Sequence, residues 1–326
     1  MREGVLIMAN LQFNGCVFEQ LDNGTLSLSE YHGAGGALEI PALVERIPVS
    51  EVDADAFASG GPVTAFSVSP DHPAFSVRDG VLYNKEGTAL VRYPFGRTDE
   101  SFTVPAGVRD LRHSAFADAA HLKTVSLPAS LEGMGSHAFT DCTALESLHL
   151  PDNLHRMGRS VFRGCVSLSD LAVSSSHPVY QREGSFLLNV QERALILSLP
   201  ALTGKEADVP ALHSVEEFAF VRCEQLEKVV LHTGLRSIGR YAFYHCASLR
   251  DVHLPASLRS IGSRAFSGCT ALKTLRVPEN VTSIEYKAFN NCNQLTLTVA
   301  RHSYAERYCR QFNFPCRHEF RWPWEK

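Results

Sequence analysis

One residue spacing constrains the fold of this chain more than any other feature of it. Consecutive members of a phenylalanine series are 23 residues apart, except across two gaps of 59 and 58 residues. The series is Phe57, Phe116, Phe139, Phe162, Phe220, Phe243, Phe266 and Phe289. A unit of 23 residues cannot bury its own apolar side chains, so copies become stable only by stacking and sharing one interior. The spacing therefore predicts a solenoid.

Each repeat has the same internal pattern. Residues 249–255 read Leu-Arg-Asp-Val-His-Leu-Pro, and the positions before the proline alternate as in a half-buried strand. We expect His253 to face solvent and its two neighbours to face the interior. Residues 257–262 are predicted to form a second short extended segment, and Ala265 and Phe266 a turn whose ring fills the interior. The fold class is therefore mostly β, with a parallel β ladder.

The two long gaps in the series hold inserts that resemble each other, near residues 72–94 and 177–200. In each insert, two apolar segments flank a short polar segment, which predicts a β-hairpin. The predicted strands are 77–83 and 88–93 in the first insert, and 185–190 and 194–199 in the second. The sequence leaves open whether the inserts serve a function or only add ladder strands.

The two ends of the chain depart from the repeat and are predicted to cap it. Asp22-Asn23-Gly24 is a strong turn signal between two apolar segments, and Ser303-Tyr304-Ala305-Glu306 is a capping-box pattern that begins a helix. The Trp322-Pro323-Trp324 tail is expected to fold back over the last coil. The predicted domains are an N-terminal β cap at 1–41, a solenoid at 42–300, and a C-terminal helical cap and tail at 301–326.

Six of the nine cysteines belong to the repeat, because each lies three residues after a ladder phenylalanine. Equivalent side chains of neighbouring coils lie about 4.8 Å or more apart, whereas disulfide-bonded Cβ atoms prefer ~3.5–4.5 Å. We therefore expect free thiols packed as small apolar groups, which favours a reducing or oxygen-poor compartment. Near the C-terminus, cap packing is favoured over a zinc site for His302, Cys309, Cys316 and His318.

Charge and hydropathy exclude two classes of partner. Lys and Arg total 31 against 35 Asp and Glu, for a net charge of −4, so no basic stripe for nucleic acid is expected. Apolar runs such as 194–199 are far shorter than the ~20 residues that span a bilayer.

Residues 1–10 make a poor signal peptide, so a cytoplasmic protein is expected, with a cell-surface or secreted one as the alternative. We expect a monomer.

Motifs that carry chemistry are absent from the sequence. It contains no Gly-rich dinucleotide or phosphate loop, no His-Glu-x-x-His and no Gly-x-Ser-x-Gly. His149 and His253 should face outward, but no acid or nucleophile lies at a fixed spacing from them. We therefore predict no enzymatic activity, no cofactor and no metal.

The repeat resembles the bacterial leucine-rich repeat family of the BspA-like type, whose pattern is roughly Leu-x-x-Ile-x-Leu-Pro, Leu-x-x-Ile-Gly, Ala-Phe, x-x-Cys. The Asp-Gly-Val-Leu-Tyr phrase at 79–83 and the Ser-Tyr-Ala-Glu phrase at 303–306 also look familial. The resemblance covers nearly the whole chain. It implies an adhesion or partner-binding protein whose repeat carries no catalytic motif, and many such proteins act at the cell surface.

The outward residues of the predicted strands align in two columns that are the best candidates for a binding surface. We therefore predict a non-enzymatic protein–protein interaction module, with a cell-surface adhesin for host protein or glycan as the alternative. The candidate residues are Thr124, Ser126, Ser147, His149, Asp170, Lys228, Asp251, His253, Thr274 and Arg276.

Overall fold

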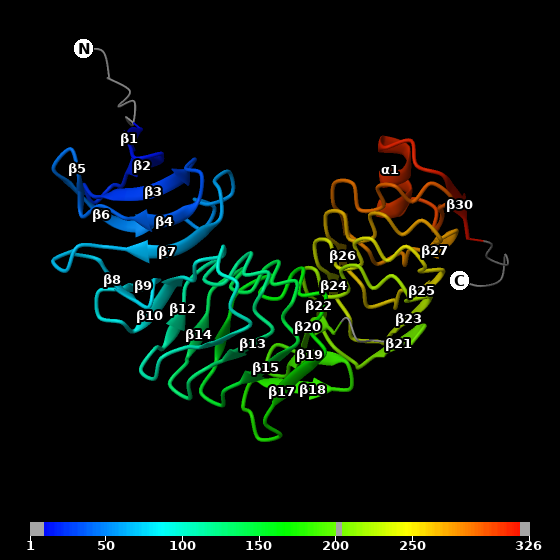
Figure 1. The fold of residues 1–326 in the computed structure, drawn as a ribbon. Coiled ribbons are helices and arrows are strands. Elements are labelled where there is room, and N and C mark those ends of the chain that lie inside the picture. The colour runs from blue at the N-terminus through cyan, green and yellow to red at the C-terminus, as the bar shows by residue number, and fades with distance from the viewer. Residues whose placement is uncertain (1–9, 200–203, 320–326) are drawn as a thin grey trace, which may run out of the picture. The chain divides into compact units, whose positions relative to one another are not determined.

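The computed structural model describes residues 10–199 and 204–319, and it confirms a mostly β solenoid with coils of about 23 residues (Figure 1). Thr124 pairs with Ser147 in parallel register, 23 residues further along the chain, as the phenylalanine spacing requires. The chain divides into two compact units, Met1–Ala172 and Val173–Lys326, here called unit 1 and unit 2. The domain boundaries drawn from the sequence at 41/42 and 300/301 stay predictions.

Unit 1 begins with a five-stranded sheet. Its strands, in spatial order, are β1 (Leu11–Phe13), β2 (Cys16–Gln20), β3 (Leu26–Tyr31), β6 (Ile47–Val52) and β5 (Leu43–Val44). The expected turn at Asp22-Asn23-Gly24 joins β2 to β3, with Gly24 at φ +80°, a conformation that glycine adopts without strain. Beside this sheet, β4 (Gly36–Glu39) pairs in parallel with β7 (Val63–Ser67).

The first insert starts one of the two ladders of unit 1. The order of this sheet is β16 (Arg156–Met157), β14 (Gly133–Met134), β12 (Asp110–Leu111), β10 (Ala89–Arg92), β9 (Val81–Asn84) and β8 (Phe75–Arg78). The hairpin between β9 and β10 confirms the prediction, but the single strand predicted at 77–83 is wrong. Asp79 and Gly80, at φ +50° and +74°, form a turn that divides it into β8 and β9. Because β10 pairs in parallel with β12, the insert supplies the first ladder strand.

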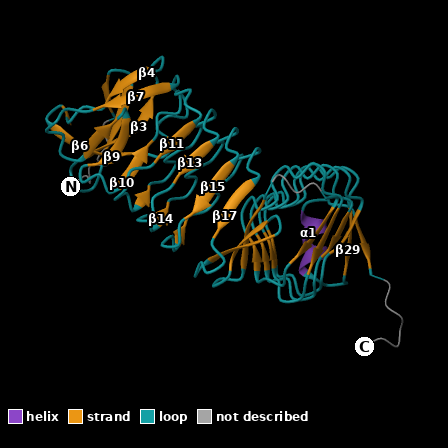
Figure 2. Cartoon of the chain, turned by 60° about the horizontal axis from the view of Figure 1, so that its bottom comes forward, coloured by secondary structure: helices purple, strands orange, loops and turns teal. Residues whose placement is uncertain are grey.

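The second ladder of unit 1 carries the alternating strands predicted from the repeat, which lie side by side in Figure 2. They are β11 (Ser101–Thr103), β13 (Thr124–Ser126), β15 (Ser147–Leu150) and β17 (Asp170–Val173).

Unit 2 repeats this construction. Its insert ladder has the order β18 (Tyr180–Glu183), β19 (Phe186–Asn189), β20 (Ala194–Ser198), β22 (Ser214–Val215), β24 (Ser237–Ile238), β26 (Ser260–Ile261) and β28 (Ser283–Ile284). The predicted hairpin is confirmed as β19 and β20, and β20 begins the parallel ladder as β10 does. The alternating strands are β21 (Glu206–Val209), β23 (Lys228–Leu231), β25 (Asp251–His253), β27 (Thr274–Arg276) and β29 (Thr296–Val299). The exposed strand β30 (Cys316–His318) pairs in parallel with β29.

From Phe116 onward, the ladder phenylalanines stack face to face in the core of each unit, whereas Phe57 makes only tilted and edge contacts. The rings of Phe116 and Phe139 lie 4.9 Å apart and 1° from parallel, and those of Phe243 and Phe266 lie 5.0 Å apart and 8° from parallel. All four side chains are fully buried. Burying such a ring contributes about 1.5–3 kcal/mol, and the stacking adds about 0.5–1.5 kcal/mol per pair.

The cysteines of the repeat form a second column beside the phenylalanines. Five of the six thiols, all except that of Cys223, donate a hydrogen bond to the carbonyl oxygen of the phenylalanine one coil earlier, as Cys142 does to Phe116 at 3.1 Å and Cys269 to Phe243 at 3.2 Å. All nine cysteines lie in the described part of the chain and are free, which confirms the expectation of unbridged thiols. Burial raises the pKa of Cys292 to about 11.

A short helix, α1 (Tyr304–Gln311), follows the last coil. Ser303 caps it as predicted, because its hydroxyl oxygen accepts a hydrogen bond from the Glu306 amide at 3.2 Å. Tyr308 is buried and its ring lies 6.0 Å from that of Phe289, whereas Phe312 is 44% exposed. The helix therefore covers the end of the phenylalanine stack. The fold-back expected of the tryptophan tail lies outside the described residues.

Candidate partner-binding face

The alternation of the ladder strands decides which side chains reach the surface. In β13, Val125 is buried while Thr124 and Ser126 on either side are exposed. In β25, Val252 is likewise buried between the exposed Asp251 and His253. All ten candidate residues are exposed or half-buried on these strands, and we call this outward surface the ladder face. Its role in binding a partner stays a prediction.

The ladder face of unit 1 brings its five candidate residues together. A groove of about 310 Å³ is lined by all of them, namely Thr124, Ser126, Ser147, His149 and Asp170. The parallel register places Thr124 directly beside Ser147. The hydroxyl, imidazole and carboxylate groups here offer hydrogen-bond donors and acceptors to a partner.

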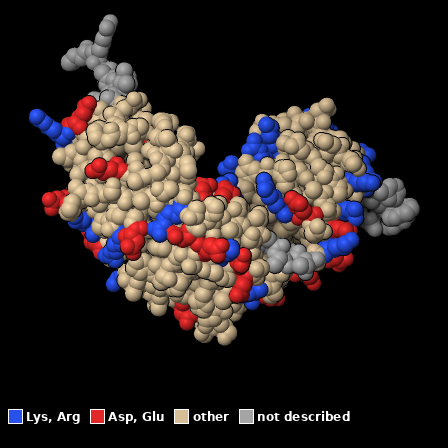
Figure 3. Space-filling model, viewed as in Figure 1, with Lys and Arg blue, Asp and Glu red and all other residues tan. Residues whose placement is uncertain are grey.

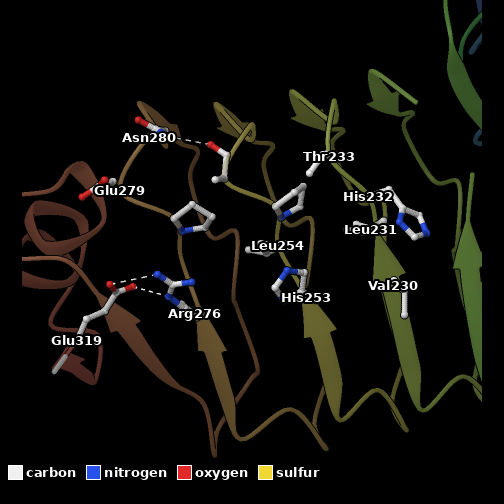
Figure 4. A pocket seen from close by; sticks show the side chains of 13 residues that line it. Val230, Leu231, His232, Thr233, His253, Leu254, Arg276, Glu279, Asn280 and Glu319 are labelled. Atoms are coloured by element: carbon white, nitrogen blue, oxygen red, sulfur yellow. Dashed lines mark hydrogen bonds and ion pairs between the residues drawn. The ribbon is translucent and has the colours of Figure 1, made fainter. Parts of the chain in front are cut away.

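The ladder face of unit 2 brings together only part of its candidate set. His253 and Arg276 line a pocket of about 450 Å³ (Figure 4), whereas Lys228, Asp251 and Thr274 do not. The pocket lies where the strands end, because the loops that follow β23, β25 and β27 supply most of its wall.

Ion pairs within the chain already engage several charged groups of this pocket. Arg276 donates from Nε and Nη2 to the Glu319 carboxylate at 2.7 and 3.3 Å, and Figure 4 shows the two side chains pointing toward each other. The hydrogen bond to Glu319 raises the pKa of Arg276. His232 Nε2 lies 2.5 Å from Asp208 Oδ1. Since these side chains are largely exposed, except for Glu319, they orient the pocket more than they stabilise the fold.

The strand pattern alone missed the loop residues of the pocket. They include His232, Thr233, Glu279, Asn280 and Glu319. A signal for most of them exists in the repeat, because His232, Pro255 and Pro278 line the pocket and are 23 residues apart, each within two positions of the end of its strand. Extending the two columns past the strand ends would have found these positions.

A family model described as the BspA type leucine rich repeat region matches residues 92–186 and 205–309, in 6 copies. The chain belongs to the BspA-type leucine-rich repeat family. The matched residues include the repeated coils of both units, so the family assignment rests on the repeats whose geometry is described above.

Two solved structures resemble this BspA-type protein over most of its length. One, described as a leucine rich cell surface protein from Faecalibacterium prausnitzii, has 22% identity and a TM-score of 0.64, covering 96% of this chain and 95% of its own. The other, described as the pneumococcal vaccine antigen PcpA, has 18% identity and a TM-score of 0.53, covering 90% and 82%. None of the curated proteins matches this sequence. At these identities the likeness concerns the fold.

The ladder face of this BspA-type protein places histidines and acidic residues in the same groove or pocket. His149 shares its groove with Asp170, and His253 shares its pocket with Glu279 and Glu319. Across residues 10–199 and 204–319, no hydrogen bond or ion pair joins either imidazole to a carboxylate.

The described residues of the repeat protein contain neither a metal-binding cluster nor a membrane-spanning helix. Within them, no group of three or more His, Cys, Asp or Glu side chains is placed to hold a metal ion. His318, one of the residues weighed for zinc, has its Nε2 2.7 Å from Glu306 Oε1 instead. In the same part of the chain, no helix is long and apolar enough to cross a bilayer. On the face shown in Figure 3, acidic and basic side chains are interspersed within each unit.

Proposed function

We propose that this BspA-type repeat protein is a non-enzymatic interaction module that binds a protein partner through its ladder face. The observation that supports the proposal is that the ladder face carries a groove across the strands in unit 1 and a pocket at the strand ends in unit 2, each lined in part by hydrogen-bonding side chains. Stacked coils make such a surface long and continuous, and repeat proteins bind partners on surfaces of this kind. A typical protein interface needs about 800 Å² from each partner, which a row of coils supplies.

The chemistry of the ladder face favours a protein over nucleic acid or a small molecule. The chain has a net charge of −4, and the ladder face mixes Lys228 and Arg276 with Asp170 and Asp251. Phosphate backbones need a field of one sign, which is absent from this set of residues. The groove of unit 1 is lined by hydroxyl, imidazole and carboxylate groups and the pocket of unit 2 by imidazole and charged groups of both signs, and apolar side chains lie between them in both, a composition that suits a protein interface.

Site-specific photo-crosslinking tests the proposal. A photoreactive amino acid is placed at Ser126 or His253 on the ladder face, and at Val166 or Tyr286 as controls, which are 49% and 59% exposed outside the ladder strands. The full chain is then incubated with an extract of the source cells and irradiated. We expect adducts with one protein from the ladder positions alone. Adducts of equal yield from all four positions, or only from the controls, contradict the proposal.

The second candidate is a cell-surface adhesin that binds a host protein or glycan. It is supported by the description of one similar structure as a cell surface protein and of the other as a vaccine antigen. The same crosslinking variants separate the two candidates when they are offered host-cell surface proteins instead of the source extract. Antibody labelling of intact cells supplies the independent measurement, because an adhesin is labelled without permeabilising them. Labelling that needs permeabilised cells rejects the adhesin.

A further inference from the structure

Unit 1 contains a cavity of about 620 Å³ that lies apart from the ladder face. Its wall comes from the first turns of the insert ladder and from the segment around Phe57. The side chains that matter below are Phe57, Arg92, Phe95, Asp118, His137 and Asp141. The volume falls within the range of about 300–1,000 Å³ that is usual for small-molecule sites.

The arginine in this wall is unusual because it is buried without a full set of partners. Arg92 is 4% exposed, its Nη1 donates to the Ser114 carbonyl oxygen, and its Nη2 lies 3.7 Å from Asp118 Oδ2. Its Nε is buried and has no hydrogen-bond partner. The rings of Phe57 and Phe95 lie 5.3 and 5.4 Å from the guanidinium. A guanidinium has five N–H donors, so this one retains capacity for an acceptor.

The fold itself does not require an arginine at this position. The Tyr93 amide donates to Ala115 in unit 1 as the Ser198 amide donates to Ala219 in unit 2, both at 2.7 Å. The residue before each is therefore equivalent, and in unit 2 it is the buried Leu197. Since a leucine completes the same ladder there, the arginine points to a role beyond packing. Burying a charge without full compensation costs several kcal/mol, which a purely structural position avoids.

The charges around the cavity decide what kind of ligand it suits. Arg92 and Arg163 supply guanidinium groups, and Asp55, Asp118 and Asp141 supply carboxylates. An anion would face three carboxylates and a cation a buried guanidinium, so both are disfavoured. Arg163 Nη2 donates to Asp141 Oδ2 at 2.9 Å, and this hydrogen bond orients both side chains in the wall. A neutral ligand that both donates and accepts hydrogen bonds matches the guanidinium donors and carboxylate acceptors of this wall.

We propose that this cavity binds a neutral saccharide. The hydroxyl groups of a sugar donate to the Asp118 and Asp141 carboxylates and accept from Arg92. The half-buried Phe95 ring offers an apolar surface to the C–H face of the sugar. Burial raises the pKa of Asp118, yet Arg92 opposes this effect and favours the carboxylate as an acceptor. The site is separate from the ladder face, so binding of a protein there and of a sugar here are independent.

Ligand-observed saturation-transfer NMR on the full chain tests the proposal. The probes are the methyl glycosides of glucose, galactose, mannose, xylose and N-acetylglucosamine, with a uronate and a 2-amino sugar as charged analogues. We expect at least one neutral glycoside to bind and the charged analogues to bind more weakly. Absence of binding by every neutral glycoside, or binding of the charged analogues alone, overturns the proposal.

Three variants locate the binding. Arg92→Leu introduces the residue that unit 2 has at this position and should weaken binding by about tenfold or more, as expected for loss of a charged hydrogen bond. Asp118→Asn, at a side chain that is 61% exposed, should weaken it by about fivefold without disturbing the fold. Asp170→Asn on the ladder face is the matched control and should bind as wild type does. Circular dichroism checks the fold of each variant. Wild-type affinity in Asp118→Asn together with Arg92→Leu rejects the site, and if Arg92→Leu does not fold, Asp118→Asn alone decides.

Discussion

The insert ladders of units 1 and 2 share their backbone and differ in their outer side chains. The residue two positions before each ladder phenylalanine from Phe116 onward has a left-handed φ between 54° and 60° in both units. In unit 1 these residues are Ser114, His137 and Ser160, and in unit 2 they are Phe218, Tyr241, Arg264 and Lys287. A non-glycine residue in this conformation is tolerated only where the surrounding structure imposes it. The stacked coils therefore impose the backbone, while the side chain is free to differ.

That freedom gives the two units different surfaces. In unit 2 the Phe218 and Tyr241 rings stack at 4.8 Å and 7° from parallel, and Arg264 donates to the Tyr241 hydroxyl. In unit 1 the column is small or polar, and Ser114 and His137 line the cavity that holds Arg92. In this chain the buried positions of the repeat determine the fold, and the exposed positions differ between the two units.

Loss of a ladder phenylalanine should have the largest effect and should be equal in the two units. Phe139→Ala in unit 1 and Phe243→Ala in unit 2 each remove a fully buried ring that is stacked on both sides. We expect each to lower the free energy of unfolding by about 3–5 kcal/mol. Chemical denaturation followed by circular dichroism measures the loss. A loss below about 1 kcal/mol in either unit would show that its stack is not the core.

Exchanging the residues at the equivalent positions 92 and 197 should change the stability of the protein in different directions. Arg92→Leu removes a buried charge, so we expect stability that is unchanged or raised, by at most about 4 kcal/mol. Leu197→Arg places a charge where the structure of unit 2 provides a buried apolar site, so we expect a loss of about 2–4 kcal/mol. Thermal denaturation compares the two variants with wild type. Equal losses in both would mean that Arg92 serves the fold.

The alkylation rates of the cysteines should show how well each unit protects its buried thiols. Cys142 and Cys165 in unit 1 and Cys246 in unit 2 are buried, and burial raises the pKa of the half-buried Cys223 to about 12. Because the thiolate is the reactive form, we expect alkylation in the native protein at least about 100-fold slower at these residues than at the exposed Cys316. Mass spectrometry after timed iodoacetamide treatment gives the rates. Fast labelling confined to one unit would show that its ladder opens locally.

The interior of the fold was predictable because the repeat constrains it directly. The 23-residue spacing fixed the coils, the alternation around Val125 and Val252 fixed the ladder face, and Ser303 and Glu306 fixed the helix start. The single strand predicted at 77–83 failed because an Asp-Gly turn lies inside an otherwise apolar segment. Turn chemistry at residues 79–80 carried that information, and it outweighed the strand propensity of its neighbours.

The candidate sites were less predictable, because they depend on which residues from different coils lie together. The strand columns included His253 and Arg276, which line the pocket of unit 2. They could not include Glu319, the ion-pair partner of Arg276, because it lies 43 positions further along the chain and follows the helix. The buried position of Arg92 also has no sequence signal, since it stands in the apolar end of an insert strand. Only the equivalence with Leu197, which the hydrogen bonds reveal, shows that the arginine is unusual.

The smallest expected effect concerns the helix that covers the end of the unit 2 stack. Hydrogen bonds from His318 and from the His302 amide lower the pKa of Glu306 to about 2. A carboxylate with a lowered pKa in the folded state stabilises it above the unfolded value of ~4.3, and this contribution is lost as the pH falls toward 2. We therefore expect Glu306→Gln to lower the Tm slightly at pH 7, and the difference from wild type to close between about pH 4.5 and 2.

Thermal denaturation of both proteins across that pH range measures the closure, and the exposed Glu224→Gln serves as the control with no difference expected at any pH. A Glu306→Gln difference that persists unchanged at pH 2 would mean that the side chain stabilises the helix by packing, because packing does not titrate. Closure of the difference would instead assign the helix contact to charge. The stability of the helix at the end of unit 2 would then depend on pH. The stability of the phenylalanine stacks in both units would not.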